Sequence, residues 1–146
     1  FWRRSTDQDS EMTGYPGKPS QLAFDQTGTV LATGGSDLVT VWSFQGSGPE
    51  GTVPGQLSLH TDPISCLSFS HREMLLASGA RDGSVFVWML QNDGHGDALG
   101  GAFAGKRVEA ISWRPDDCAL AAINAKGKIA VWDFKIRTKT TPKGFI

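Results

Sequence analysis

Long apolar runs are missing from this sequence. The longest, VFVWML at residues 85–90, is far below the roughly 20 residues that a membrane helix needs, so we expect no membrane span and no membrane partner. The opening segment FWRRSTDQDSE has no apolar stretch behind its two arginines, which argues against a secretory signal. Because the first residue is not methionine, we expect the chain to begin inside a longer one.

An excess of one charge is also missing. Lys and Arg together number 14 and Asp and Glu together number 15, so no global field attracts nucleic acid or an acidic membrane. A partner recognised by charge must therefore meet a local patch. We do not expect a nucleic-acid partner on these grounds.

Cysteine is scarce, and the usual reactive motifs are absent. Cys66 and Cys118 have no CxxC spacing and no histidine cluster beside them, so we interpret them as free thiols of an intracellular, cytoplasmic protein. Cys66 is expected to be a small buried residue and Cys118 a turn residue. There is no P-loop and no HExxH motif, so we expect no cofactor and no metal.

What the sequence does contain is one motif written three times. LATGGSDLVTVW, LASGARDGSVFVW and LAAINAKGKIAVW occupy residues 31–42, 76–88 and 120–132. The aromatic landmarks Phe24, Phe69 and Trp113 are spaced 45 and 44 residues apart, and Trp42, Trp88 and Trp132 are spaced 46 and 44 apart. A period of this length indicates stacked supersecondary units, none of which can bury its faces alone.

Each copy is typical of short strands and not of helices. In the central copy we expect strands at 63–70, 74–80 and 84–90, with the turn RDG at 81–83 between the last two, because Asp and Gly tolerate the backbone angles of tight turns. A fourth strand, GQLSLH at 55–60, precedes them. Four antiparallel strands per repeat are therefore predicted, and the segment NDGHGDALGG at 92–101 is interpreted as a connector.

His60 followed by ISCLSF and then by LASGARDGSVFVW resembles the WD (tryptophan-aspartate) repeat of β-propellers over residues 55–90. The flanking copies extend the resemblance more weakly, since the Trp-Asp dipeptide itself occurs only at Trp132-Asp133. The resemblance implies an all-β fold of four-stranded antiparallel β-propeller blades. We expect about three blades in an incomplete ring, because closed propellers have about four to eight. The expected divisions are the end of one blade at 1–15 and repeats at about 16–59, 60–103 and 104–146.

In this family a His, a Ser or Thr, an Asp and the strand Trp form a hydrogen-bonded tetrad within a blade. The resemblance places that structural tetrad in the central copy at His60, Ser78, Asp82 and Trp88. The same Ser, His and Asp have the composition of a hydrolase triad, but no nucleophile elbow accompanies them, and we favour the structural interpretation.

The two outer copies depart from the tetrad. The first is expected to keep a partial tetrad of Tyr15, Thr33, Asp37 and Trp42, with Asp37 matching only approximately. The third has Ala104, Ala122 and Lys126 with Trp132, so its network is lost and apolar packing must replace it. The packing residues expected there are Val108, Ile111, Trp113, Leu120, Ile123, Ile129 and Val131.

The resemblance implies a non-catalytic scaffold for protein–protein interactions, with partners on the loops near the His and Asp positions. We expect the partner-binding residues to include Lys18, Asp62, Arg81, Arg107 and Asn124, with Arg81 first, because a guanidinium binds carboxylate or phosphate with two hydrogen bonds. Further partners are the remaining propeller blades of a parent chain, or copies of this chain that close a ring as a homo-oligomer.

Two other functions stay open as alternatives. A propeller enzyme would need a converging His and carboxylate cluster, and the sequence has only three histidines. A nucleic-acid platform would use the basic tail, in which Lys135, Arg137, Lys139 and Lys143 follow Asp133 with no further acid. The segment GSGPEG at 46–51 fits a dinucleotide-binding pattern, but Pro54 and Gly55 after it forbid the helix which that motif requires.

Overall fold

The computed structural model of the protein describes residues 2–3, 8–9 and 11–134. These residues form thirteen β-strands. Within this part of the chain there is no helix that could cross a membrane. The predicted all-β class is therefore confirmed.

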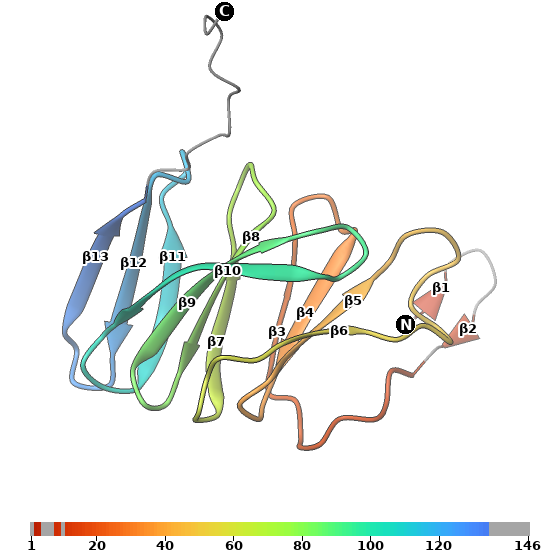
Figure 1. Ribbon diagram of the computed structural model, residues 1–146, viewed down its shortest axis with the longest axis horizontal. Helices are drawn as coiled ribbons and strands as arrows, with labels where there is room; N and C mark the ends of the chain where they lie inside the picture. Colours follow the sequence, from red (N-terminus) through yellow and green to blue (C-terminus); the bar gives the residue numbers. More distant parts are fainter. Residues whose placement is uncertain (1, 4–7, 10, 135–146) are drawn as a thin grey trace, which may run out of the picture.

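Three antiparallel sheets stand side by side, from the first near the middle of Figure 1 to the third at its left. The first sheet contains β3 (Gln21–Phe24), β4 (Val30–Gly34), β5 (Val39–Ser43) and β6 (Gly55–Leu57) in that order. The second contains β7 (Ile64–Phe69), β8 (Leu75–Ala80), β9 (Ser84–Leu90) and β10 (Gly96–Phe103). The third contains β11 (Val108–Trp113), β12 (Ala119–Asn124) and β13 (Ile129–Asp133). A separate pair, β1 (Trp2–Arg3) and β2 (Gln8–Asp9), lies near the N-terminus.

The outermost strand of the second sheet is the main correction to the predicted strands. Residues 96–103, interpreted above within a connector, form β10 and pair with β9, whereas Gly55–Leu57 pairs with β5 of the first sheet. Glycine suits position 101 of β10 because the side chain of Phe86 lies directly beside it: a Cβ on Gly101 would come within 2.8 Å of the Phe86 ring. A glycine-rich segment in a strand marks such a close approach as well as a loop.

Each sheet has two different faces. Towards the following sheet, the first sheet presents small and β-branched residues, among them Ala32, Val39 and Val41, against Ile64 and Trp88 of the second. The second sheet repeats the arrangement, with Ala77, Val85 and Val87 packed against Trp113 and Leu120 of the third. The β-branched face of one sheet therefore always meets the tryptophan-bearing face of the next, and these two layers form the cores.

The main chains of the first two sheets also approach closely at their outer strands. A Cβ on Gly55 of β6 would collide with the carbonyl oxygen of Gly94, which precedes β10. Gly94 has a φ of 94°, a left-handed conformation that glycine adopts without steric cost. Both glycines are therefore required where the two sheets meet.

The outward face of the third sheet is uncovered by any described residue. The side chains of Ile129 and Val131 are 66% and 63% exposed, and Ile123 is partly exposed. The expectation that these three residues hold the third sheet together is therefore wrong. Of the seven packing residues that were predicted, Val108, Trp113 and Leu120 are buried against the second sheet and Ile111 is partly buried there. At the other end of the arc, Leu22 and Phe24 of the first sheet are also exposed, so the ring is not closed.

Candidate functional site

A chain of hydrogen bonds runs through the second sheet and ends at a carboxylate. The indole Nε1 of Trp88 donates to the Ser78 hydroxyl (2.8 Å), and Ser78 is bonded to Nε2 of His60 (2.7 Å). His60 Nδ1 is bonded to the Ser84 hydroxyl (2.7 Å), which donates to Asp82 (2.7 Å). All four predicted residues therefore lie in one network, but Ser84 stands between His60 and Asp82.

The direction of these bonds follows from the two ends of the chain. An indole N–H can only donate and an ionised carboxylate can only accept. Each group between them therefore accepts a hydrogen bond from the Trp88 side and donates one towards Asp82. Neutral His60 with its proton on Nδ1 satisfies every bond. No buried side-chain nitrogen or oxygen in the described part of the chain lacks a partner, as a stable polar network requires.

Burial and charge act in opposite senses on the two titratable members. Burial lowers the pKa of His60, against the attraction of the Asp82 carboxylate. Partial burial works to raise the pKa of Asp82, but hydrogen bonds from the Ser84 hydroxyl and amide, together with the charge that His60 carries when it is protonated at acidic pH, hold the pKa below its usual range. His60 is thus kept neutral and Asp82 ionised near neutral pH.

Ser84 is the member that sequence reasoning missed. It lies two residues after Asp82, and its amide also donates to the Asp82 carboxylate (2.9 Å), which is the local turn that Asp forms with residue i+2. That local signal was available in the RDGS segment.

The first sheet has a shorter network centred on Tyr15. The tyrosine hydroxyl accepts bonds from Trp42 Nε1 (2.8 Å) and from the Thr33 hydroxyl (3.0 Å), and the Tyr15 and Trp42 rings meet edge to face at 6.3 Å. Asp37 is exposed, and no hydrogen bond described in this region joins it to the other three. Three of the four predicted residues therefore meet, and Asp37 stands apart.

The third sheet replaces the network with Asn124. Ala104 and Ala122 are buried and Lys126 is exposed. The Asn124 side chain is 4% exposed; its Nδ2 donates to Ala104 O (2.8 Å), and its Oδ1 accepts from the amides of Lys126 and Lys128 (both 3.0 Å). Asn124 was expected to contact a partner directly, but its burial makes it a residue that positions the β12–β13 turn.

The turns after β4, β8 and β12 lie along the lower edge of Figure 1, together with the segments that enter β7 and β11. We call this edge the loop end. Main-chain hydrogen bonds join its parts: Arg81 N donates to Pro63 O (3.0 Å), Ala104 N to Gly83 O (2.8 Å) and Ala125 N to Arg107 O (2.8 Å). Of the predicted partner-binding residues, Lys18, Arg81 and Arg107 are exposed and Asp62 is partly exposed.

The opposite edge contains a clamp between the second and third sheets. The buried carboxylate of Asp117 accepts bonds from three successive amides, those of His71 (2.8 Å), Arg72 (2.7 Å) and Glu73 (3.3 Å). Asp117 has a φ of 60°, the only positive value among the described non-glycine residues.

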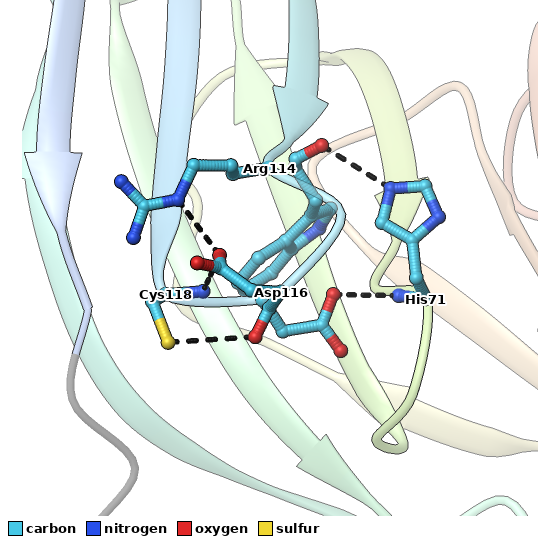
Figure 2. A network of polar contacts seen from close by, with 6 residues as sticks. His71, Arg114, Asp116 and Cys118 are labelled. Atoms are coloured by element: carbon cyan, nitrogen blue, oxygen red, sulfur yellow. Dashed lines mark hydrogen bonds and ion pairs between the residues drawn. The ribbon is translucent and has the colours of Figure 1, made fainter.

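Side chains surround this clamp, as Figure 2 shows. The His71 ring bonds to the carbonyl oxygen of Trp113 (3.2 Å), and Arg114 donates to Asp116 (2.7 Å). Cys118 lies in the turn, as predicted, and is exposed; its thiol contacts Asp116 O (3.4 Å).

Reactive groups are not presented to solvent by these networks. Ser78 has no exposed surface, so its hydroxyl cannot reach a substrate as a triad nucleophile must. Cys66 is buried, and burial raises the pKa of its thiol to about 11. No group of three or more His, Cys, Asp or Glu side chains among the described residues could hold a metal ion. The basic tail, Lys135 to Lys143, lies outside the described residues.

Radially arranged antiparallel sheets, each anchored by a strand tryptophan, define a segment of a β-propeller. The WD domain, G-beta repeat, family matches residues 51–89. A solved structure, titled "Crystal Structure of Mitotic Checkpoint Complex", contains a chain that superposes with a TM-score of 0.71 at 21% identity, over 90% of this chain and 39% of that one. The chain belongs to the WD-repeat family of β-propeller proteins.

The curated relatives are much longer than this chain. Periodic tryptophan protein 2 of Saccharomyces cerevisiae is 33% identical over 116 residues, which is 78% of this chain and 12% of that protein. The WD repeat-containing protein 26 homolog of Arabidopsis thaliana is 38% identical over 87 residues, which is 56% of this chain and 15% of the relative. The match therefore extends over less than one sixth of either relative.

Proposed function

We propose that the chain is a non-catalytic scaffold that binds another protein at its loop end. The single observation that carries the proposal is the hydrogen bonding between neighbouring sheets at this edge, where Ile64 N donates to Ser36 O (2.9 Å) and the Ser65 hydroxyl donates to Val108 O (2.6 Å). These bonds make the loop end one continuous support for exposed charged side chains. A preorganised surface loses little entropy on binding. The buried hydroxyl of Ser78 and the buried thiol of Cys66 suit a binding role better than a chemical one, and two free thiols fit a reducing, intracellular compartment.

Site-specific crosslinking tests this proposal. A photoreactive phenylalanine derivative replaces Arg81 at the loop end or, as the matched control, Arg72, an exposed arginine in the turn at the opposite edge. In cell extract we expect a protein adduct at position 81 and none at position 72. The crosslinked partner is then purified, and the same adduct should form when it is mixed with this protein alone. Equal yields at both positions, or no adduct at Arg81, would overturn the proposal.

We also propose that the outward face of the third sheet binds another blade. Ile129 and Val131 occupy the same strand positions as Val85 and Val87, which in the second sheet are buried against the third. A sheet with a tryptophan-bearing face is therefore the complementary partner. Light scattering on a dilution series shows where the covering blade comes from. A mass that falls on dilution indicates a second copy of this chain, and a constant monomer mass indicates a blade from elsewhere in a longer chain. A monomer in which Ile129→Lys changes neither solubility nor mass would argue against any such contact.

A further inference from the structure

Five cations gather on the part of the loop end that belongs to the second and third sheets. All are exposed: Arg81, Lys106, Arg107, Lys126 and Lys128. They come from three separate segments, the β8–β9 turn, the segment before β11 and the β12–β13 turn. We call them the basic cluster.

Two buried residues hold these three segments together. Asn124 bonds to Ala104 through Nδ2 and to the amides of Lys126 and Lys128 through Oδ1. The carbonyl oxygen of Gly83 accepts a hydrogen bond from the amide of Ala104. Gly83 also packs so closely against the segment before β11 that a Cβ on it would lie 2.9 Å from Lys106 O. The main-chain segments that carry the cations are therefore fixed relative to one another before any partner arrives.

Most of this positive charge forms no ion pair with the described residues. Arg107 pairs with Glu109 at 3.4 Å. None of the other ion pairs in the described residues involves Arg81, Lys106, Lys126 or Lys128. Asp82, beside Arg81, is occupied by the Ser84 hydroxyl and amide.

An exposed aromatic ring borders the cluster. Phe103, at the end of β10, is 67% exposed, and its Cε2 would lie 3.1 Å from a Cβ on Gly83. The same position on Gly83 lies 3.0 Å from Lys106 N, so the ring and the cation-bearing segment meet at one point. Exposed aromatic side chains and arginines are enriched where proteins bind one another.

We infer that the basic cluster and Phe103 bind an acidic segment of a partner protein, with Glu or Asp carboxylates on the cations and an apolar side chain on the Phe103 ring. The inference rests on the proposed scaffold function. Carboxylates of a polypeptide fit better than a continuous phosphate backbone, because Asp62, Asp82 and Glu109 are interspersed with the cations and would repel a polyanion. The net charge of −1 for the whole chain also offers no long-range attraction to nucleic acid.

Fluorescence anisotropy with the full chain tests this inference. The probe is a labelled twelve-residue peptide of Glu and Asp with one central Leu, and the control probe has Gln and Asn in their places. We expect the acidic peptide to bind and the amide peptide not to bind, with affinity falling about tenfold or more when Lys106→Glu and Lys126→Glu are combined. The matched control, Arg72→Glu with Arg114→Glu, makes the same change of charge at the opposite edge, where both arginines are exposed, and should change affinity less than about twofold.

The other outcomes are also decisive. No binding of the acidic peptide, or an equal loss in both double variants with unchanged circular dichroism, overturns the inference. Tighter binding of a twelve-nucleotide single-stranded DNA than of the peptide would make this a nucleic-acid surface and would also overturn it. A protein adduct at Arg81 without peptide binding refutes only the acidic partner, whereas the absence of both refutes the scaffold function as well.

Discussion

Replacing Ser78 by alanine tests whether the hydrogen-bond chain stabilises the second sheet. Ser78 has no exposed surface, and its hydroxyl serves both Trp88 Nε1 and His60 Nε2. The substitution leaves both of these buried groups without a partner. Each unsatisfied buried group costs about 1–3 kcal/mol, so we expect the free energy of unfolding to fall by about 2–5 kcal/mol. That is a large share of the stability of a small domain.

Urea unfolding followed by circular dichroism measures this loss. Ser112→Ala, an exposed serine of strand β11, is the matched control and should change stability by less than about 0.5 kcal/mol. In a Trp88→Phe background the indole donor is already gone, so Ser78→Ala should cost about 1–2 kcal/mol less than in the wild type. A loss for Ser78→Ala as small as that of Ser112→Ala, or an equal loss in both backgrounds, would refute the argument that the network stabilises the sheet.

Three further predictions concern titration, backbone strain and thiol reactivity. Burial lowers the pKa of His60 below 6.5 in the folded state, so its contribution to stability is present above pH 6.5 and is lost as the pH falls through the lower folded value. The urea midpoint should therefore fall between pH 7.5 and pH 5, and His60→Gln should make this dependence on pH weaker. The same dependence in the variant and the wild type would contradict this. Asp117→Ala and Asp117→Gly both remove three hydrogen bonds, but only alanine keeps the cost of a positive φ, so the melting temperature should be lower for Ala than for Gly; the reverse order would exclude strain at this site. Cys118 is exposed whereas Cys66 is buried with a pKa of about 11, so Ellman's reagent at pH 8 should modify Cys118 at least about 100-fold faster, and comparable rates would show that the two sheets open readily.

The central repeat could be predicted closely because its signals are local. Alternating apolar residues around the RDG turn place β8 and β9, and the structure has them within a residue of the prediction. Strand β10 could not be predicted in this way, since Gly96, Gly100 and Gly101 give no alternating pattern. The ring of Phe86, which leaves room only for glycine at position 101, lies on the neighbouring strand.

The polar residues, too, could be predicted only where their partners are close in the sequence. The partners of Asp117 are amides of the turn after β7, up to 46 positions earlier in the chain, and no spacing argument connects them. Asn124 was expected on the surface because it lies in a loop near the His and Asp positions. Its hydrogen bond to Ala104 O, 20 positions earlier, holds the side chain inside. Ser84, by contrast, has its carboxylate partner two residues away and was within reach of sequence reasoning.

The unlike faces of each sheet give the arc a direction. A tryptophan-bearing face meets a β-branched face at both internal boundaries, so the contact is heterologous, and two copies cannot join by placing the same face of each together. A unit duplicated within the gene would bring one face of each kind and could enter at any boundary without redesign of its neighbours. This directionality makes the number of blades easy to change during evolution, while the loops at one edge of every blade still point in the same direction.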